Sequence, residues 1–453
     1  ARLRAKLREY YEGEGRSDAV RLALPKGSYA VRIEFDQPGS SHAEKADAAP
    51  RAGSLPIASI QDKPSVVVLP FVNMSPDSAE QYFADGLTED LTTELTRLSG
   101  LFVISRHSAF AYRGTAKRVQ EIARELGVGY LVEGSVRRSG ERVRVSAQLI
   151  DAAFGAHLWA ERYDRELQDI FALQDDVTRS IASVLKVKLT GIEKERVPRI
   201  DVHDCLLRGL ERFWNYSQEA TEEARALFAQ AVKLDPAYAP AHAWLARALV
   251  FQWIMMWDPK PETLDQAFEH ARTAVDLDER LAFAHSVLGW IQLWRRQAGE
   301  AIAAGLRALA LDSNNADGHL FLACSLAAAG RGDEALPYIE MGMRLNPHPS
   351  ALSLFVLGYC YYVLEEYDNA VAAFTRGAEL RHVFYPPHYY LCLIYTLLGR
   401  DEEARAERET LLALTGGRRP FTEELDLAAD LQRRTRALAQ LAGLPPIHDS
   451  ERR

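Results

Sequence analysis

The sequence predicts two fold classes in one chain: an α+β domain, a mixed-sheet α/β sandwich, followed by an all-α solenoid of helical hairpins. Between residues 63 and 192, apolar runs of strand type alternate with amphipathic helical runs. Between residues 203 and 415, a leucine followed by a small residue recurs in steps of 34 or 35, at Leu288, Leu322, Leu357 and Leu391. A period near 34 with small residues at fixed positions is typical of stacked helical hairpins, because small side chains let neighbouring helices approach closely.

The composition is that of a multidomain globular protein. The chain has 453 residues, 47% of them apolar and 26% charged, which is too long for one core. The net charge of -9 argues against coating nucleic acid and leaves room for one local basic patch. No run approaches the roughly 18 apolar residues of a membrane span. We therefore expect no membrane span and a cytoplasmic location.

Cysteine usage agrees with a reducing compartment. The four cysteines, Cys205, Cys324, Cys360 and Cys392, lie far apart in the repeat region and show no metal-ligand spacing. We expect packed, reduced thiols in place of disulfides or a metal site.

Residues 1–35 predict a helix followed by a two-stranded hairpin. Apolar residues at helical spacing come first, and alternating residues around the turn at 25–27 follow. The stretches ARLRAKLREYY and VRLALPKGSYAVRI resemble the last helix and wing of OmpR-type winged-helix DNA-binding domains, over half of such a domain. The alternative is a solvated charged helix, since Glu9, Glu12 and Glu14 follow the basic residues. The DNA contacts that the resemblance implies are Arg2, Arg4, Lys6, Arg8 and Lys26.

Residues 36–62 are rich in Pro, Gly, Ser and Ala and show no apolar period. This composition predicts a flexible linker.

The next segment, residues 63–192, predicts the order βαβαβββα, a mixed sheet with helices packed on it. The expected strands are 66–71, 101–104, 130–136, 143–150 and 157–162, and the expected helices are 79–98, 119–126 and 170–189.

A family resemblance covers residues 64–190. The runs VVVLPFVNMSPDSAEQYFADGLTEDLTTELTRLSG and ELGVGYLVEGSVRRSGERVRVSAQLIDAAFGAHLWAERYDRELQDIFALQDDV resemble the TolB-like amino-terminal domain of bacterial multidomain regulators. In that family the domain follows a winged-helix regulator domain or a class III nucleotidyl cyclase and precedes tetratricopeptide repeats. The resemblance implies a role in signal transduction or transcription regulation, and it supplies no catalytic residues.

The sequence carries no recognised catalytic motif. Phosphate-binding loops, dinucleotide fingerprints, zinc-protease motifs and esterase elbows are absent, so we expect no enzyme activity, no cofactor and no metal. The glycines at 134 and 140 indicate a hairpin turn and not a nucleotide site. Asp85, Glu89 and Asp90 are interpreted as acidic residues of a first helical turn, which is more typical than a metal site.

Six helical hairpins can be counted in the repeat region, which has the period of tetratricopeptide repeats. The second is about ten residues longer than the period and predicts an inserted loop around 257–261, and residues 420–445 predict a capping helix. The expected hairpins are roughly 204–236, 237–280, 282–315, 316–350, 351–384 and 385–414.

The first helix of each hairpin lines the concave surface in such stacks, and here that surface is predicted to be aromatic. Aromatic grooves suit an apolar peptide, an amphipathic helix or the chain's own preceding domain. The alternative is that the rings form the core between repeats. The predicted groove residues are Phe251, Phe283, Trp290, Trp294, Phe355, Tyr359, Tyr362 and Tyr389.

These patterns favour a non-catalytic regulatory segment of a bacterial regulator that binds a protein or peptide in its groove. Two alternatives stay open: the regulatory half of a class III nucleotidyl cyclase, and an assembly scaffold.

Overall fold

The computed structural model describes residues 20–23, 32–35, 63–98, 100–187, 199–418, 425 and 427–445, and it divides the chain into two compact units, Ala1–Ala58 and Ser59–Arg453. In the first unit, β1 (Val20–Ala23) and β2 (Arg32–Phe35) pair antiparallel, with Val20 opposite Phe35. The alternating residues predict a hairpin in this part of the chain, with a second strand that begins earlier than Arg32.

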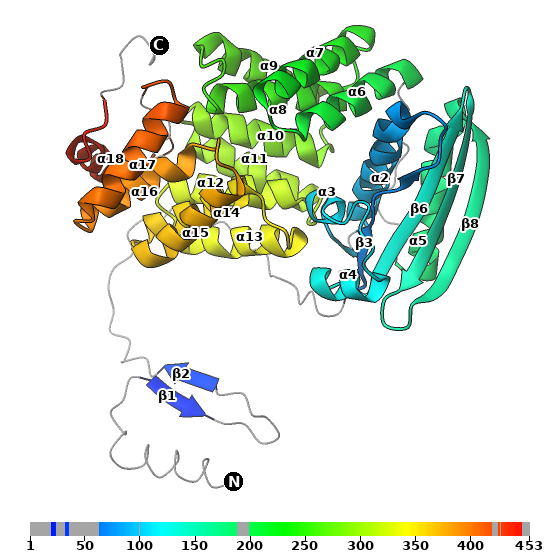
Figure 1. The fold of residues 1–453 in the computed structure, drawn as a ribbon, viewed down its shortest axis with the longest axis horizontal. Helices are drawn as coiled ribbons and strands as arrows, with labels where there is room; N and C mark the ends of the chain where they lie inside the picture. Colours follow the sequence, from blue (N-terminus) through cyan, green and yellow to red (C-terminus); the bar gives the residue numbers. More distant parts are fainter. Residues whose placement is uncertain are drawn as a thin grey trace, which may run out of the picture. The chain divides into compact units, whose positions relative to one another are not determined.

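The second unit begins with a mixed six-stranded sheet in the order β5-β3-β6-β7-β8, with β4 also paired to β6 (Figure 1). The short strand β3 runs parallel to β5 and β6, whereas β6, β7 and β8 form antiparallel hairpins. The bounds are β3 Ser65–Val68, β4 Val72–Asn73, β5 Phe102–Val103, β6 Tyr130–Ser139, β7 Arg142–Asp151 and β8 Ala156–Glu166.

Helices cover both faces of this sheet. Helices α2 (Gln81–Thr96) and α5 (Ile170–Val184) share one core cluster with Val66 and Val68, and α3 (Arg106–Phe110) and α4 (Val119–Leu126) share another with Val67. Successive residues of a strand point to opposite faces, so a strand covered on both sides has to be apolar throughout. The continuous run of valines in β3 meets that requirement.

Three features of this part differ from the expectation. Strand β4 and helix α3 are too short to show a period, and neither was expected. Strands β6 and β8 extend past the expected ends, to Ser139 and Glu166. The added residues are charged or polar except for the buried ring of Tyr163, so alternation of apolar residues does not mark them.

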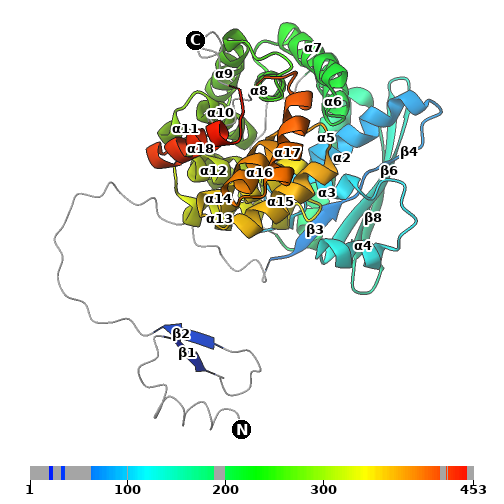
Figure 2. The same ribbon diagram turned by 60° about the vertical axis from the view of Figure 1, so that its left-hand side comes forward.

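In residues 199–418 the structure describes a TPR-like helical repeat region of twelve helices paired as six hairpins, which stack side by side in both views (Figures 1 and 2). A further helix, α18 (Ala429–Leu441), packs on α16. The paired helices are α6 Ile200–Phe213 with α7 Gln218–Leu234, α8 Ala239–Ile254 with α9 Pro261–Leu277, α10 Ala282–Trp294 with α11 Ala298–Leu311, α12 Ala316–Ala328 with α13 Gly332–Leu345, α14 Ala351–Val363 with α15 Tyr367–Leu380, and α16 Pro386–Leu397 with α17 Asp401–Leu414.

The repeated small residues set the spacing of the two helices in a hairpin. A Cβ on Gly289 would lie 2.9 Å from the carbonyl oxygen of Ala301, and a Cβ on Gly358 would lie 2.7 Å from the ring of Phe374. Both distances are too short for any larger side chain, so glycine permits the close approach. The 34-residue period is therefore the distance in sequence between equivalent contacts of successive hairpins.

Among the described residues, no helix is both long and apolar enough to cross a membrane. The four cysteines are buried free thiols. Burial raises the pKa of the Cys360 thiol well above its usual range, which makes this thiol unreactive.

Candidate functional site

The predicted DNA contacts Arg2, Arg4, Lys6, Arg8 and Lys26 lie outside the described residues. The predicted groove residues are described, and the structure places almost all of them in the interior. Phe283 is half-buried, and the other seven are at most 9% exposed, namely Phe251, Trp290, Trp294, Phe355, Tyr359, Tyr362 and Tyr389.

These rings pack against other side chains of the repeat region. Trp290 stacks on Phe321 with ring centres 4.6 Å apart. The Tyr362 hydroxyl lies 2.9 Å from Thr435 Oγ1, which brings it under the capping helix α18. A partner that reached these rings would have to displace the contacts that they make within the chain.

Hairpins far apart in the stack are also bonded to one another. The Tyr385 hydroxyl donates to the carbonyl of Ile254 (2.6 Å), and Arg381 Nη2 donates to the carbonyl of Tyr216 (2.6 Å). These bonds join the fifth and sixth hairpins to the first and second. Arg247 on α8 is 4% exposed. The residues predicted to line a groove therefore pack mostly within the chain.

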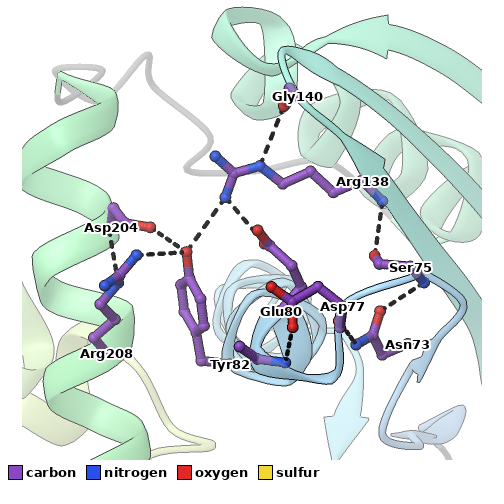
Figure 3. Close-up of polar contacts among 10 residues, drawn as sticks. Asn73, Ser75, Asp77, Glu80, Tyr82, Arg138, Gly140, Asp204 and Arg208 are labelled. Carbon is purple, nitrogen blue, oxygen red and sulfur yellow. Dashed lines mark hydrogen bonds and ion pairs between the residues drawn. The ribbon is translucent and has the colours of Figure 1, made fainter.

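The strongest polar site lies where the α/β part meets the first repeat helix, around the hydroxyl of Tyr82 (Figure 3). Tyr82, on α2, donates to Asp204 Oδ1 of α6 at 2.5 Å. Its oxygen also accepts from Arg138 Nη1 (3.3 Å) of β6 and from Arg208 Nη2 (3.4 Å) of α6. One hydroxyl thus joins three elements, and two of them come from the α/β part.

Two ion pairs lie beside this hydroxyl. Arg138 Nη1 lies 3.1 Å from Glu80 Oε2, and Arg208 Nε lies 2.9 Å from Asp204 Oδ2. Burial, followed by the bond to Asp204, raises the pKa of Tyr82. The phenol therefore stays protonated at neutral pH and remains a donor.

The three α2 carboxylates Asp85, Glu89 and Asp90 are all paired; Glu89 and Asp90 reach the first repeat helix, whereas the partner of Asp85 lies in the α/β part. Because α2 begins at Gln81, they lie beyond its first turn, so the first-turn interpretation was wrong. Asp85 pairs with Arg113. Asp90 Oδ2 accepts from Gln174 Nε2 of α5 (2.7 Å) and lies 3.1 Å from His203 Nε2 of α6.

Glu89 completes this set. Its Oε2 lies 2.9 Å from Arg106 Nε, and the Arg106 guanidinium lies 5.0 Å from the centre of the Trp214 ring at the end of α6. Burial raises the pKa of Glu89 to about 7 even with this cation beside it. No group of three or more metal-ligating side chains occurs in the described part of the chain.

A glycine allows α2 to approach α6 closely. A Cβ on Gly86 would lie 2.5 to 2.8 Å from the side-chain carbons of Leu207, which is 2% exposed. Any larger residue at this position would have to push α6 away or force Leu207 to move.

Two loops of the repeat region hold the other side of the α/β part. Asn314 Nδ2 donates to the carbonyls of Thr96 (2.9 Å) and Leu101 (3.0 Å), which satisfies the end of α2. The buried Ser108 hydroxyl donates to Asn346 Oδ1 (2.5 Å) and accepts from the backbone of His348 (2.8 Å). The α/β part is thus held by α6 and by the loops that precede α12 and α14.

The sequence did not point to these contacts. Asn314 and Asn346 are polar turn residues of a kind found at the end of any repeat, and their partners in the α/β part lie more than 200 residues away. Asn314 is buried, but its neighbours in the turn are equally polar and more exposed, so the sequence does not single it out.

The inserted loop 255–260 borders a cavity of about 510 Å³. Two of its three carboxylates, Glu222 and Asp258, are already paired with Arg225 and Lys260. The cavity is therefore a weaker candidate than the interface. Its lining consists of Gln218, Glu219, Glu222, Arg225, Leu249, Gln252, Trp257, Asp258 and Gln266.

Together these features define a helical-repeat protein of tetratricopeptide (TPR) type whose repeats are bonded to a mixed-sheet α/β part.

No family model matches the chain. The chain is 43% identical over 264 residues to the Rhizobium meliloti (strain 1021) protein called "Putative adenylate cyclase 3", a match covering 57% of this chain and 45% of that protein. It is 24% identical over 302 residues to the transcriptional regulator HilA of Salmonella paratyphi A, covering 64% of this chain and 53% of HilA.

The chain therefore spans about half the length of these curated relatives. Among solved structures, a thermophilic TPR protein of Thermus thermophilus aligns with a TM-score of 0.33 and 21% identity, covering 40% of this chain and 91% of that one. The repeat fold itself rests on the six hairpins.

Proposed function

We propose that the chain is a non-catalytic regulatory and protein-interaction segment of a bacterial signalling or transcription-regulating protein. Its relatives are named for two different outputs, a cyclase and a transcriptional regulator, and this supports a regulatory part shared between them. The finer identity, a TolB-like domain at residues 63–192 and a winged-helix-like module at residues 1–35, belongs to this proposal.

One observation supports the proposal: contacts within the chain join distant hairpins and bury the rings predicted to line a groove. The bonds from Arg381 to Tyr216 and from Tyr385 to Ile254 bridge distant hairpins, and the α/β part is held at α6. A protein or peptide partner that inserts apolar side chains would compete with these contacts. Such competition between two arrangements is a means of regulation, because the partner binds one of them better.

The experiment weakens the closure and asks whether the groove becomes available. The variant Arg381→Ala with Tyr385→Phe removes both bridging donors, and Arg376→Ala with Tyr361→Phe is a matched control in α15 and α14. The bridge variant should bind the dye 8-anilinonaphthalene-1-sulfonate more strongly than wild type and the control, with unchanged helical circular dichroism. Equal dye binding in all three proteins would contradict a closed groove.

A partner is then sought in living bacteria by photo-crosslinking from the half-buried position 283 of the wild-type and bridge-variant chains. A defined protein that crosslinks more strongly to the bridge variant supports regulation by competition. A crosslink of equal strength in both would contradict it.

The non-catalytic part of the proposal has a direct assay. The purified chain, incubated with ATP or GTP and Mn²⁺, should form no cyclic nucleotide above a protein-free blank. Formation of cyclic AMP or cyclic GMP would contradict this proposal.

A second candidate is the regulatory half of a class III nucleotidyl cyclase, which the 43% identity to the Rhizobium protein favours. The gene sequence around this segment separates the candidates. A cyclase domain with paired metal-binding aspartates supports this second candidate, whereas helices that complete a winged-helix domain support a transcription regulator. If neither is encoded, an assembly scaffold is the better description.

DNA contact by the first module is tested separately with a gel shift on duplex DNA. Charge reversal of Arg2, Arg4 and Arg8 should abolish the shift. Unchanged affinity would remove DNA binding from the proposal.

A further inference from the structure

Strand β8 (Ala156–Glu166) ends the sheet, and no other strand in the described part of the chain pairs with its outer edge. Most of its residues are exposed. Helix α5 packs on one face of β8, where Tyr163 is 5% exposed. An edge strand of 11 residues presents a row of free backbone donors and acceptors, which favours pairing with another strand.

The charges in the second half of β8 are complementary to those of a second, antiparallel copy of the same strand. Residues 161 to 165 read Glu-Arg-Tyr-Asp-Arg. In an antiparallel pair of two β8 strands centred on Tyr163, Glu161 of one copy lies opposite Arg165 of the other, and Arg162 lies opposite Asp164. Directly opposed residues share a face, and opposite charges there stabilise the pair. The arrangement gives four such pairs around the two-fold axis.

Some of these charges already have contacts within the chain: Glu161 Oε2 accepts from the Tyr163 hydroxyl, a neutral donor, at 2.8 Å. Arg162 lies opposite Ser146 on β7, so no carboxylate of β7 faces it. Asp164 pairs with Arg144 at 2.6 Å and Arg142 at 3.3 Å, and it is still 34% exposed. In the strand pair, Arg162 of the second copy would lie beside Asp164, a carboxylate whose position is already fixed.

The irregular part of β8 lies elsewhere. The register shift with β7 falls between Leu149 and Ile150, opposite residues 157–159, and the pairing from Ala160 to Glu166 is continuous. Charged residues often protect an edge by repelling a second strand. A protective pattern would place like charges opposite one another, whereas this pattern places opposite charges together.

We propose that two copies of this chain associate through their β8 strands, antiparallel and centred on Tyr163, so that the two sheets become one continuous sheet. This inference is independent of the proposed function, because it rests only on the edge and the charges of the α/β part. The partner is a second copy of the same chain.

The test measures the mass of the full chain by sedimentation equilibrium over a range of concentrations. The wild-type chain should show a monomer–dimer equilibrium. The variant Arg165→Glu places Glu161 opposite a glutamate and should raise the dimer dissociation constant by about tenfold or more. The swap Glu161→Arg with Arg165→Glu restores opposite charges and should return the constant to within about threefold of wild type.

Hydrogen exchange locates the contact. Exchange of the amides of residues 160–166 should slow as the wild-type concentration rises, and it should not slow in Arg165→Glu. A wild-type chain that stays monomeric up to about 100 µM, a concentration far above the dissociation constant of a stable homodimer, would overturn the proposal. A dimer that Arg165→Glu leaves unchanged would also overturn it, since the interface would then lie elsewhere.

Discussion

The Tyr82 hydroxyl donates to the carboxylate of Asp204 at 2.5 Å, across 122 residues of sequence. This bond joins the first long helix of the α/β part to the first helix of the repeats. Around it lie the close approach of Gly86 to Leu207, the Asp90–His203 contact and the Arg106–Glu89 ion pair. These contacts make the two parts support each other.

Tyr82→Phe removes this hydroxyl and keeps the ring. Asp204 and Arg138 lose a partner in a site that is 6% exposed at Tyr82, so the variant should lose about 1–3 kcal/mol of unfolding free energy. Urea unfolding followed by circular dichroism measures the loss. Tyr361→Phe, at a half-buried position in α14, is the control and should change stability by less than about 0.5 kcal/mol. Equal effects of the two variants would show that the Tyr82 bond contributes nothing specific.

Gly86→Ala tests the close contact between α2 and α6. Helix propensity alone predicts that this variant is more stable than wild type, whereas the close contact predicts that it is less stable. Alanine in place of a helical glycine ordinarily stabilises by about 1 kcal/mol. Here the new Cβ would overlap Leu207, and such overpacking costs about 1–3 kcal/mol, so we expect a net loss. Gly299→Ala in α11, where a Cβ would meet nothing within 4 Å, should be neutral or stabilising. If both variants stabilise the chain, the contact between α2 and α6 is looser than the structure shows.

Glu89 makes stability depend on pH near neutrality. Its pKa rises from 4.5 to about 7 on folding, so the folded state holds the proton more tightly. The stability linked to this proton is complete below about pH 4.5 and is lost as pH rises through about 7. Wild type should therefore lose thermal stability relative to Glu89→Gln between about pH 5.5 and pH 8.5. The difference between the two proteins isolates Glu89, because Arg106, Asp85 and Asp90 are present in both. A constant difference would mean that Glu89 titrates normally.

Trp290→Ala should behave as a core substitution. The ring is 1% exposed and stacks on Phe321, so its removal should cost about 3–5 kcal/mol and lower the thermal midpoint. Trp257→Ala, at a half-buried ring of the inserted loop, should cost less. An unchanged midpoint for Trp290→Ala would place this ring on an open groove, as the groove hypothesis requires.

The repeat region was the most predictable part of the fold. Each hairpin contains the same kind of contact between its two helices, such as Gly289 with Ala301, whose residues are only 12 apart in sequence. Because this contact recurs once per hairpin, its small residues repeat about every 34 residues and can be recognised in the sequence. The mostly helical repeats and the mixed sheet were predicted correctly, whereas β4 and α3 are too short to show a period.

The candidate site was less predictable, for two physical reasons. Apolar residues at helical spacing are needed equally by an open aromatic groove and by a packed core, so the positions of Trp290 and Tyr359 could not distinguish them. Polar contacts such as Tyr82–Asp204 and Ser108–Asn346 join residues 122 and 238 apart. No local pattern records such a partner. The groove as a binding surface stays a prediction.

The α/β part and the repeats stabilise each other, and hydrogen exchange of the full chain carrying Gly86→Ala tests this coupling. We expect faster exchange in α2, in α6 and in the distant segments 312–315 and 346–350, which hold the other side of the α/β part. Faster exchange confined to α2, with these segments unchanged, would contradict it.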